Sequence, residues 1–276
     1  MTVFNGSVTN YDLFIGIDYS GAETATARLK SLQVYAGTTG GIPTKQVSPM
    51  KRQDGSAAYW SRAEIARWLI DLAKEGRRFI AGIDHVFSFP LDYFTRYKLD
   101  SWPQFLEDFV RHWPTDQSYV YVDFVREGDI ANIPSWPGPG LRIGRPTELR
   151  LCEQWTSSAK SVFQFDCQGS VAKSSHAGIP WLKRIRDAVG DRVHFWPFDG
   201  WVPVEGKAVI AEVYPSIFRR RYAGEARLAD EHDAYSISAW MLERHASGVL
   251  TTYFSPPLTP AQQEQANREG WILGVM

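Results

Sequence analysis

Three apolar runs along the chain each end on a carboxylate. They are Leu13–Ile17 before Asp18, Phe79–Ile83 before Asp84, and Ala208–Ala211 before Glu212. Short runs rich in Ile, Val, Phe and Ala are typical of buried strands. In an open α/β sheet the ends of neighbouring strands lie at one edge, where ligands bind. The pattern therefore predicts a sheet with converging acidic side chains.

The rest of the pattern alternates strands with helices. Two β-rich stretches around Thr38–Gly41 predict a hairpin, and apolar positions from Ile65 to Leu72 at helical spacing predict a helix capped by Ser61 and Glu64. Further helices are expected at about Trp102–His112, Ser118–Arg126, Ala177–Val189, Ala229–Ala246 and Thr259–Arg268. This order predicts one α/β domain over residues 1–276, with an insertion from Leu91 to about Gly206 between the fourth and fifth strands.

Composition narrows the class of protein. The chain has 276 residues, 44% of them hydrophobic, and a formal net charge of −1. That balance excludes a general attraction to polyanions, so a nucleic-acid site would need local basic clusters. Two occur, at Leu182–Arg192 and Phe218–Tyr222, although runs of this kind are also common on solvated helix faces.

Compartment is predicted from what the sequence lacks. Cys152 and Cys167 have neither metal-site spacing nor the number needed for a disulfide framework. No apolar run approaches the roughly 20 residues that span a bilayer, and the first residues lack the basic and apolar regions of a signal peptide. We expect a soluble, cytoplasmic protein with no membrane partner.

A fourth carboxylate belongs with the strand-end set. In the helix expected at Ala229–Ala246, Asp233 shares a face with Ile237 and Trp240, and Asp230 lies one turn earlier. Clustered carboxylates oppose one another's ionisation, and a hard divalent cation, Mg²⁺ or Mn²⁺, removes that penalty. The alternative for each aspartate alone is a turn or cap residue.

Several motifs together carry a family resemblance. They are "FIGIDYSG", "IAGIDHVFSFP", "KSVFQFDCQGSVAKSSHAGIPWLKRIR", "VHFWPFDGW", "AEVYPSIF" and "DEHDAYSISAWM". In this order, over about residues 13–245, the chain resembles the predicted ribonuclease H-like nucleases known as domain of unknown function 429. The resemblance implies a mixed sheet, with the hairpin strands antiparallel to the first, flanked by helices. It also implies an acidic cluster at Asp18, Asp84, Glu212 and Asp233.

These residues predict a metal-dependent phosphodiester hydrolase acting on RNA or DNA. Two ions held by the four carboxylates would stabilise the attacking and leaving oxygens at phosphorus. Substrate contacts are expected from cationic and hydroxyl side chains in the third motif and in the basic cluster Phe218–Tyr222: Lys160, Ser170, Lys173, Arg219 and Arg220. "GSVAKSSH" is not a P-loop, because Ala172 stands where the second glycine is required.

Two further residues, Glu64 and His85, could belong to the site or have a structural role only. Glu64 is expected to be a helix cap and not a further catalytic acid. His85 is expected to point away from Asp84, because side chains alternate along a strand.

The sequence is also compatible with two other functions. "GIDYSG" resembles the first phosphate loop of actin-like phosphotransferases and ATPases, although their second phosphate loop is not found in this sequence. A catalytically inactive ribonuclease H-like module that binds nucleic acid or a protein would show the same motifs.

Overall fold

The computed structural model describes residues 10–128, 136, 142–156, 158–224 and 226–276. One mixed sheet of six strands organises them, in the order β3-β2-β1-β4-β6-β5. The strands are β1 (Leu13–Asp18), β2 (Gln33–Gly37), β3 (Thr44–Gln46), β4 (Phe79–Asp84), β5 (Val193–Trp196) and β6 (Ala208–Glu212). β1, β4, β6 and β5 are parallel to one another, and β2 is antiparallel to both β1 and β3.

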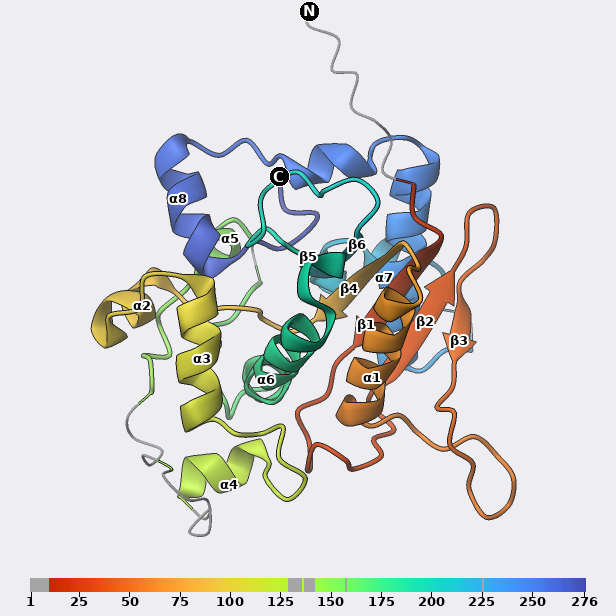
Figure 1. The fold of residues 1–276 in the computed structure, drawn as a ribbon, viewed down its shortest axis with the longest axis horizontal. Coiled ribbons are helices and arrows are strands. Elements are labelled where there is room, and N and C mark those ends of the chain that lie inside the picture. The colour runs from red at the N-terminus through yellow and green to blue at the C-terminus, as the bar shows by residue number, and fades with distance from the viewer. Residues whose placement is uncertain (1–9, 129–135, 137–141, 157, 225) are drawn as a thin grey trace, which may run out of the picture.

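Helices surround this sheet (Figure 1). They are α1 (Arg62–Lys74), α2 (Leu91–Tyr97), α3 (Trp102–His112), α4 (Val122–Glu127), α5 (Leu151–Gln154), α6 (Ala172–Val189), α7 (Ala229–Ala246) and α8 (Pro260–Glu269). Short 3₁₀ turns include η3 (Pro215–Ile217) and η4 (Arg219–Arg221), which lead from β6 toward α7.

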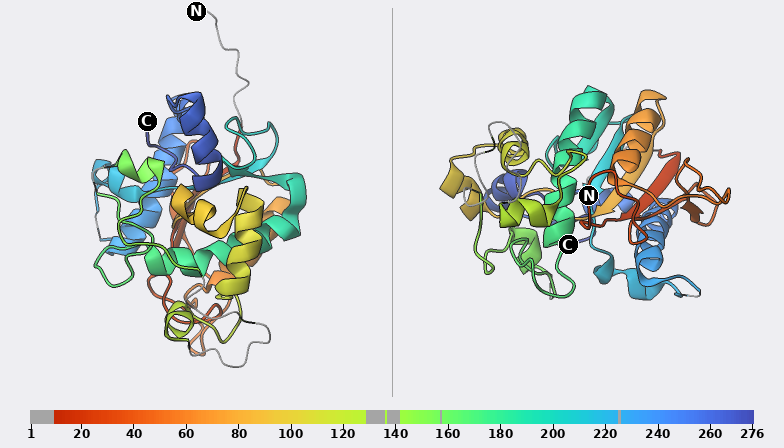
Figure 2. Two further views of the ribbon diagram at one scale, coloured as in Figure 1. Left: turned by 90° about the vertical axis from the view of Figure 1, so that its left-hand side faces the viewer. Right: turned by 90° about the horizontal axis from the view of Figure 1, so that it is seen from below.

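The sheet separates two apolar layers. α1 and α6 cover one face and α7 covers the other (Figure 2, right). Because side chains alternate along a strand, Ile15 and Ile17 of β1 pack toward α1 and α6, whereas Phe14 packs with Ile237 and Met241 of α7. The alternation places Asp18, like Phe14, on the face that α7 covers.

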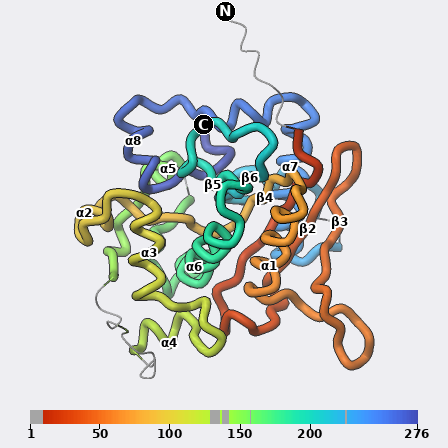
Figure 3. Tube along the Cα trace, in the orientation of Figure 1, coloured from red at the N-terminus to blue at the C-terminus, as the bar shows by residue number. Residues whose placement is uncertain are grey.

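The remaining helices lie on the side of the sheet where β5 forms the edge (Figure 3). From α8 the chain returns to the sheet, where Leu273 forms a parallel bridge with Val213 just past β6. Within the described ranges, no helix is long and apolar enough to cross a bilayer.

Much of the predicted pattern is confirmed. The chain forms an α/β fold with a mixed sheet and flanking helices, the hairpin is present, and α7 has the predicted bounds. β5 was not predicted; it lies inside the segment expected to be an insertion, so part of that segment belongs to the sheet. α6 begins at Ala172, five residues earlier than expected, which places Lys173 in its first turn.

Candidate functional site

Asp18 and Asp84 lie side by side at the ends of two parallel strands. They are the last residues of β1 and β4 and are register partners. Partners on neighbouring strands lie about 4.8 Å apart and project from the same face of the sheet. Both residues are half-buried. The predicted convergence of these two carboxylates is therefore present.

A pair of glycines brings α7 close to these strands. Gly16 and Gly82 are also register partners, two residues before the aspartates on the same face. A Cβ on Gly16 would lie 2.1 Å from the backbone oxygen of Ala234, and one on Gly82 would lie 2.7 Å from Cγ2 of Ile237. Only glycine at both positions permits this approach, which sets the height of α7 above the carboxylates.

The start of α7 faces the ends of β1 and β4. The helix runs antiparallel to β1: Ser238 donates a 2.7 Å hydrogen bond to the backbone oxygen of Phe14, and Ala234 packs over Gly16. The first turns of α7, with Asp230 and Asp233, therefore lie beside Asp18. The positive end of the helix dipole also lies there, which favours negative charge.

Asp18, Asp84, Asp230 and Asp233 are called the acidic cluster from here on. Burial and mutual repulsion disfavour the ionised form of its carboxyl groups. Burial raises the pKa of Asp18 well above its usual range, and Asp84, Asp230 and Asp233 raise it further. Burial, with contributions from Asp233 and Glu212, raises the pKa of Asp84 to about 8. Burial and Asp233 also raise the pKa of Asp230. These groups would gain from a nearby cation.

Arg219 partly supplies that positive charge. Its guanidinium contacts both carboxylate oxygens of Asp233, at 2.9 and 3.2 Å. It also lowers the pKa of Asp18 and of Asp84, although less than burial raises them. The residue predicted to contact substrate is thus the internal counter-ion of the acidic cluster.

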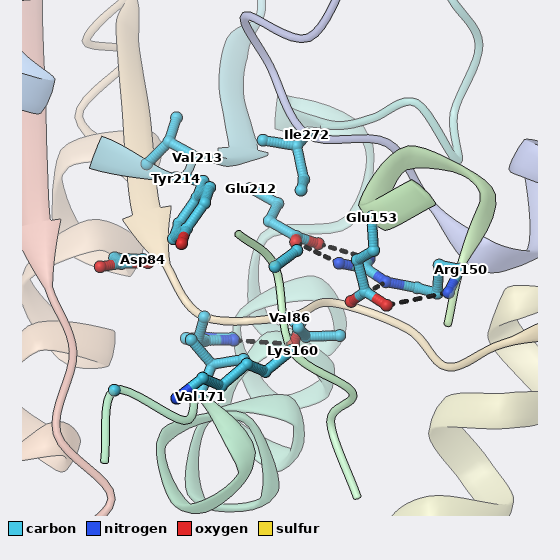
Figure 4. A pocket seen from close by; sticks show the side chains of 13 residues that line it. Asp84, Val86, Arg150, Glu153, Lys160, Val171, Glu212, Val213, Tyr214 and Ile272 are labelled. Atoms are coloured by element: carbon cyan, nitrogen blue, oxygen red, sulfur yellow. Dashed lines mark hydrogen bonds and ion pairs between the residues drawn. The ribbon is translucent and has the colours of Figure 1, made fainter. Parts of the chain in front are cut away.

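Glu212 is placed differently from the prediction. Its side chain points toward Arg150 and away from Asp84 (Figure 4). One carboxylate oxygen accepts hydrogen bonds from Arg150, at 2.8 Å, and from the backbone N–H of Phe87, at 3.0 Å. Burial raises the pKa of Glu212, and Arg150 opposes that shift. A carboxylate held in this way has little capacity to act as a metal ligand, which corrects the expectation that all four would converge.

Two of the predicted substrate contacts share a cleft with the acidic cluster. The cleft has a volume of about 500 Å³, and its walls include Asp18, Asp230, Ser170 and Lys173. The Lys173 ammonium forms a 2.7 Å ion pair with Asp123, whose side chain also lines the cleft. Cationic and hydroxyl donors therefore stand in the same space as the strand-end carboxylate.

The other two contacts lie elsewhere. Lys160 lines a small cavity of about 30 Å³ with Asp84 and Tyr214, and its ammonium donates to the backbone oxygen of Gln168. Arg220 lines a separate pocket behind η4. The five residues expected to bind substrate thus divide among three cavities and the Arg219–Asp233 pair.

The structure confirms the cap expected at Glu64 and the expected direction of His85. Glu64 closes a capping box with Ser61, accepting its backbone N–H at 3.1 Å, and forms a 2.7 Å ion pair with Arg28. His85 is buried on the opposite face of the sheet, against Gly178 of α6. Its pKa is lowered by burial to about 4, so the ring is neutral at pH 7.

Two partners of the site were not predicted. Arg150 lies 62 residues before Glu212, and Asp123 lies 50 residues before Lys173. Arg150 stands in no apolar run or quoted motif, and Asp123 lies in the helix expected at Ser118–Arg126 with nothing in that pattern to pair it with Lys173. Their pairings with Glu212 and Lys173 come from the path of the chain around α4, α5 and α6, and local sequence does not specify them.

The donor set suits a magnesium-like ion held by few protein ligands. Mg²⁺ is usually bound through one or two carboxylates and completes its shell with water and substrate phosphate. Asp18 and Asp84 match that requirement, with Asp233 and Asp230 nearby. Among the described residues, no group of three or more His, Cys, Asp or Glu side chains is arranged to hold a metal ion. A full protein cage is thus absent from this part of the chain.

Comparison with known proteins adds no relative. No family model, curated protein or solved structure matches the chain. The family resemblance therefore stays a prediction from the quoted motifs.

Proposed function

We propose that this protein is a divalent-metal-dependent phosphodiester hydrolase acting on nucleic acid. The observation that carries the proposal is the pairing of Asp18 with Asp84 at the ends of β1 and β4, with two more carboxylates on α7 beside them. The raised pKa values of both strand-end aspartates favour a cation at this position. Soluble cytoplasmic location remains part of the proposal.

A ribonuclease H-like fold is part of the same proposal. Its support is the mixed sheet, in which the antiparallel β3-β2-β1 meander continues into parallel β4 and β6. The residues from α2 to the turn before β6 would be an addition to that core, with β5 extending its edge.

The proposed reaction assigns a task to each side chain. A bound Mg²⁺ or Mn²⁺ would supply charge stabilisation at the phosphoryl oxygens and a more acidic water. Asp18 and Asp84 would hold the ion. Asp233, oriented by Arg219, lies on the α7 side of the pair. Lys173 and Ser170 would donate to phosphate oxygens from the cleft wall.

A binding module without catalysis is the second candidate. Two observations favour it: Arg219 already pairs with Asp233, and Arg150 already pairs with Glu212. Two of the four predicted ligands are thereby neutralised by arginine.

Hydrolysis of a labelled substrate panel tests the proposal. The panel contains single- and double-stranded DNA, RNA, RNA–DNA hybrid and a branched junction, each with Mg²⁺, Mn²⁺ or EDTA. Asp84→Asn removes one proposed ligand. Asp71→Asn, an exposed aspartate on α1, is the matched control because α1 covers the opposite face of the sheet.

Metal-dependent cleavage that Asp84→Asn abolishes and Asp71→Asn retains would support the hydrolase. Cleavage that is equal in wild type and Asp84→Asn would assign it to a contaminant and contradict the proposal. Oligonucleotide binding without cleavage of any substrate would favour the binding module.

A further inference from the structure

A second pocket lies along α7 from the acidic cluster. It has a volume of about 300 Å³ and is lined by Ile217, Phe218, Arg220, Arg221, Trp240, Arg244, Tyr253 and Gly274. Among these described lining residues there are three arginines and no carboxylate. We call this the arginine pocket.

Two of the three arginines, Arg221 and Arg244, are held in place by Glu243. Glu243 accepts from Nε of Arg221 at 2.9 Å and also from Arg244 and Tyr222, and these contacts lower its pKa to about 2. One permanently ionised carboxylate thus offsets one of three positive charges. A net positive pocket with pre-positioned guanidinium groups is suited to an anion.

One of the arginines remains available to a ligand. Arg220 is exposed and forms no ion pair with any described residue. Its guanidinium can therefore donate to an anion without first losing a protein partner.

The wall of the arginine pocket is aromatic. Phe218 stacks on Trp240 with ring centroids 4.8 Å apart, and Tyr253 meets Trp240 edge-on at 5.0 Å. Phe218 and Trp240 are buried, so their rings support the pocket, whereas Tyr253 is half-buried and presents a partly open ring. An open tyrosine beside arginines is typical of sites that bind a base next to a phosphate.

The arginine pocket and the acidic cluster lie along the same helix, α7. Trp240 lies two turns beyond Asp233 on one face of α7, which is about 10 Å along the helix axis. η4 joins the two regions directly, because Arg219 pairs with Asp233 and the next residue, Arg220, lines the pocket. With a rise of about 3.4 Å per stacked nucleotide, this axial distance is about three nucleotides.

We propose that the arginine pocket is a phosphate-binding subsite for single-stranded nucleic acid. It would bind a backbone phosphate about three nucleotides from the phosphate at Asp18 and Asp84, with the adjoining base on Tyr253. This inference rests on the proposed function for the identity of the strand. The subsite itself requires neither a metal ion nor cleavage.

Binding in EDTA tests the subsite apart from catalysis. Fluorescence anisotropy of a labelled single-stranded 12-mer would be titrated with the full-length protein at several salt concentrations. Arg220→Ala removes the exposed guanidinium. Arg67→Ala, an exposed arginine on α1, is the matched control on the other face of the sheet.

We expect Arg220→Ala to weaken binding about tenfold, and to reduce the slope of log K against log salt by about 0.7, the value for one phosphate contact on a single strand. Arg220→Lys should keep most of that slope, because the charge remains. Arg67→Ala should bind as wild type does.

Equal affinity and slope for Arg220→Ala and Arg67→Ala would overturn the subsite, even if metal-dependent cleavage were found. Loss of binding in Arg220→Ala would support the subsite, even if no substrate were cleaved. Inorganic phosphate is the probe for a small phosphorylated ligand. Phosphate binding that needs Arg220, without oligonucleotide binding, would overturn the assignment to nucleic acid.

Discussion

At the scale of single residues, the protonation of Asp84 is the property that most directly connects stability with the proposed chemistry. Its folded-state pKa is about 8, whereas the ordinary value is 3.8. The folded protein therefore holds a proton that the unfolded chain releases, and the associated stability is complete only below about pH 4. It is lost as the pH rises toward 8.

Asp84→Asn should accordingly stabilise the metal-free protein. One pKa unit corresponds to about 1.4 kcal/mol, and partial exposure of the carboxylate reduces the effect. We expect a gain in the free energy of unfolding of about 1–3 kcal/mol at pH 8 and a smaller gain at pH 5. Urea unfolding in EDTA at both pH values measures it. A loss of stability at pH 8 would instead assign Asp84 a hydrogen-bonding role.

A divalent cation should bind these carboxylates more tightly at high pH, where they have lost their protons. Because protons and metal compete for the same carboxylates, Mn²⁺ should raise the Tm of the wild type more at pH 8 than at pH 5. Asp84→Asn should abolish that shift, and Asp71→Asn should leave it unchanged. Equal shifts for all three proteins would place any bound Mn²⁺ elsewhere.

Arg219→Ala tests whether this guanidinium competes with metal. Its removal leaves Asp233 without its ion pair, so the metal-free protein should lose about 1 kcal/mol at pH 8, the scale of a partly exposed pair. The Tm increase on adding Mn²⁺ should become larger than in wild type, because the carboxylates then lack their internal cation. A smaller increase would show that Arg219 supports the metal site instead of opposing it.

At the scale of elements, the distance between α7 and the sheet depends on Gly16 and Gly82. Gly16→Ala would place a methyl group 2.1 Å from a backbone oxygen of α7. We expect a loss of at least about 2 kcal/mol, since backbone cannot give way as a side chain can. Gly224→Ala is the control, because nothing in the described part of the chain lies within 4 Å of its added Cβ. Urea unfolding of both variants provides the comparison, and equal stability would contradict the close approach.

The helices and strands also differ in how well their bounds can be predicted from local sequence. α7 could be predicted because apolar residues recur at helical spacing between Ala234 and Leu242 and acidic residues fill its first turn. β5 was missed because its four residues are all buried, which gives no alternation, and because aromatic residues continue past its end. The early start of α6 was missed because the polar segment from Lys173 to Ser175 lacks a helical apolar pattern.

At the scale of the whole molecule, Arg150 joins three parts of the chain. It is fully buried and contacts Glu153 of α5, Glu212 of β6 and the backbone oxygen of Glu269 at the end of α8. Arg150→Met would leave two buried carboxylates without their cation, and we expect a loss of about 3–5 kcal/mol.

Neutralising a partner should recover part of that loss. We expect Arg150→Met combined with Glu212→Gln to be more stable than Arg150→Met alone, as measured by urea unfolding of both single variants and the pair. Additive losses in the double variant would show that the two side chains do not act as a pair.

The sequence by itself determined the class of fold and two carboxylates of the acidic cluster, Asp18 and Asp84. Local apolar runs, helical spacing and caps depend on neighbours in the chain, so they identified β1, β4, β6, α1 and α7. The aspartates that end β1 and β4 could be paired because parallel strands place their ends at one edge. Only the tertiary structure decided which carboxylates are available. Glu212 and Asp233 have arginine partners that lie 62 and 14 residues away in the chain, and such partners are set by the packing of distant segments.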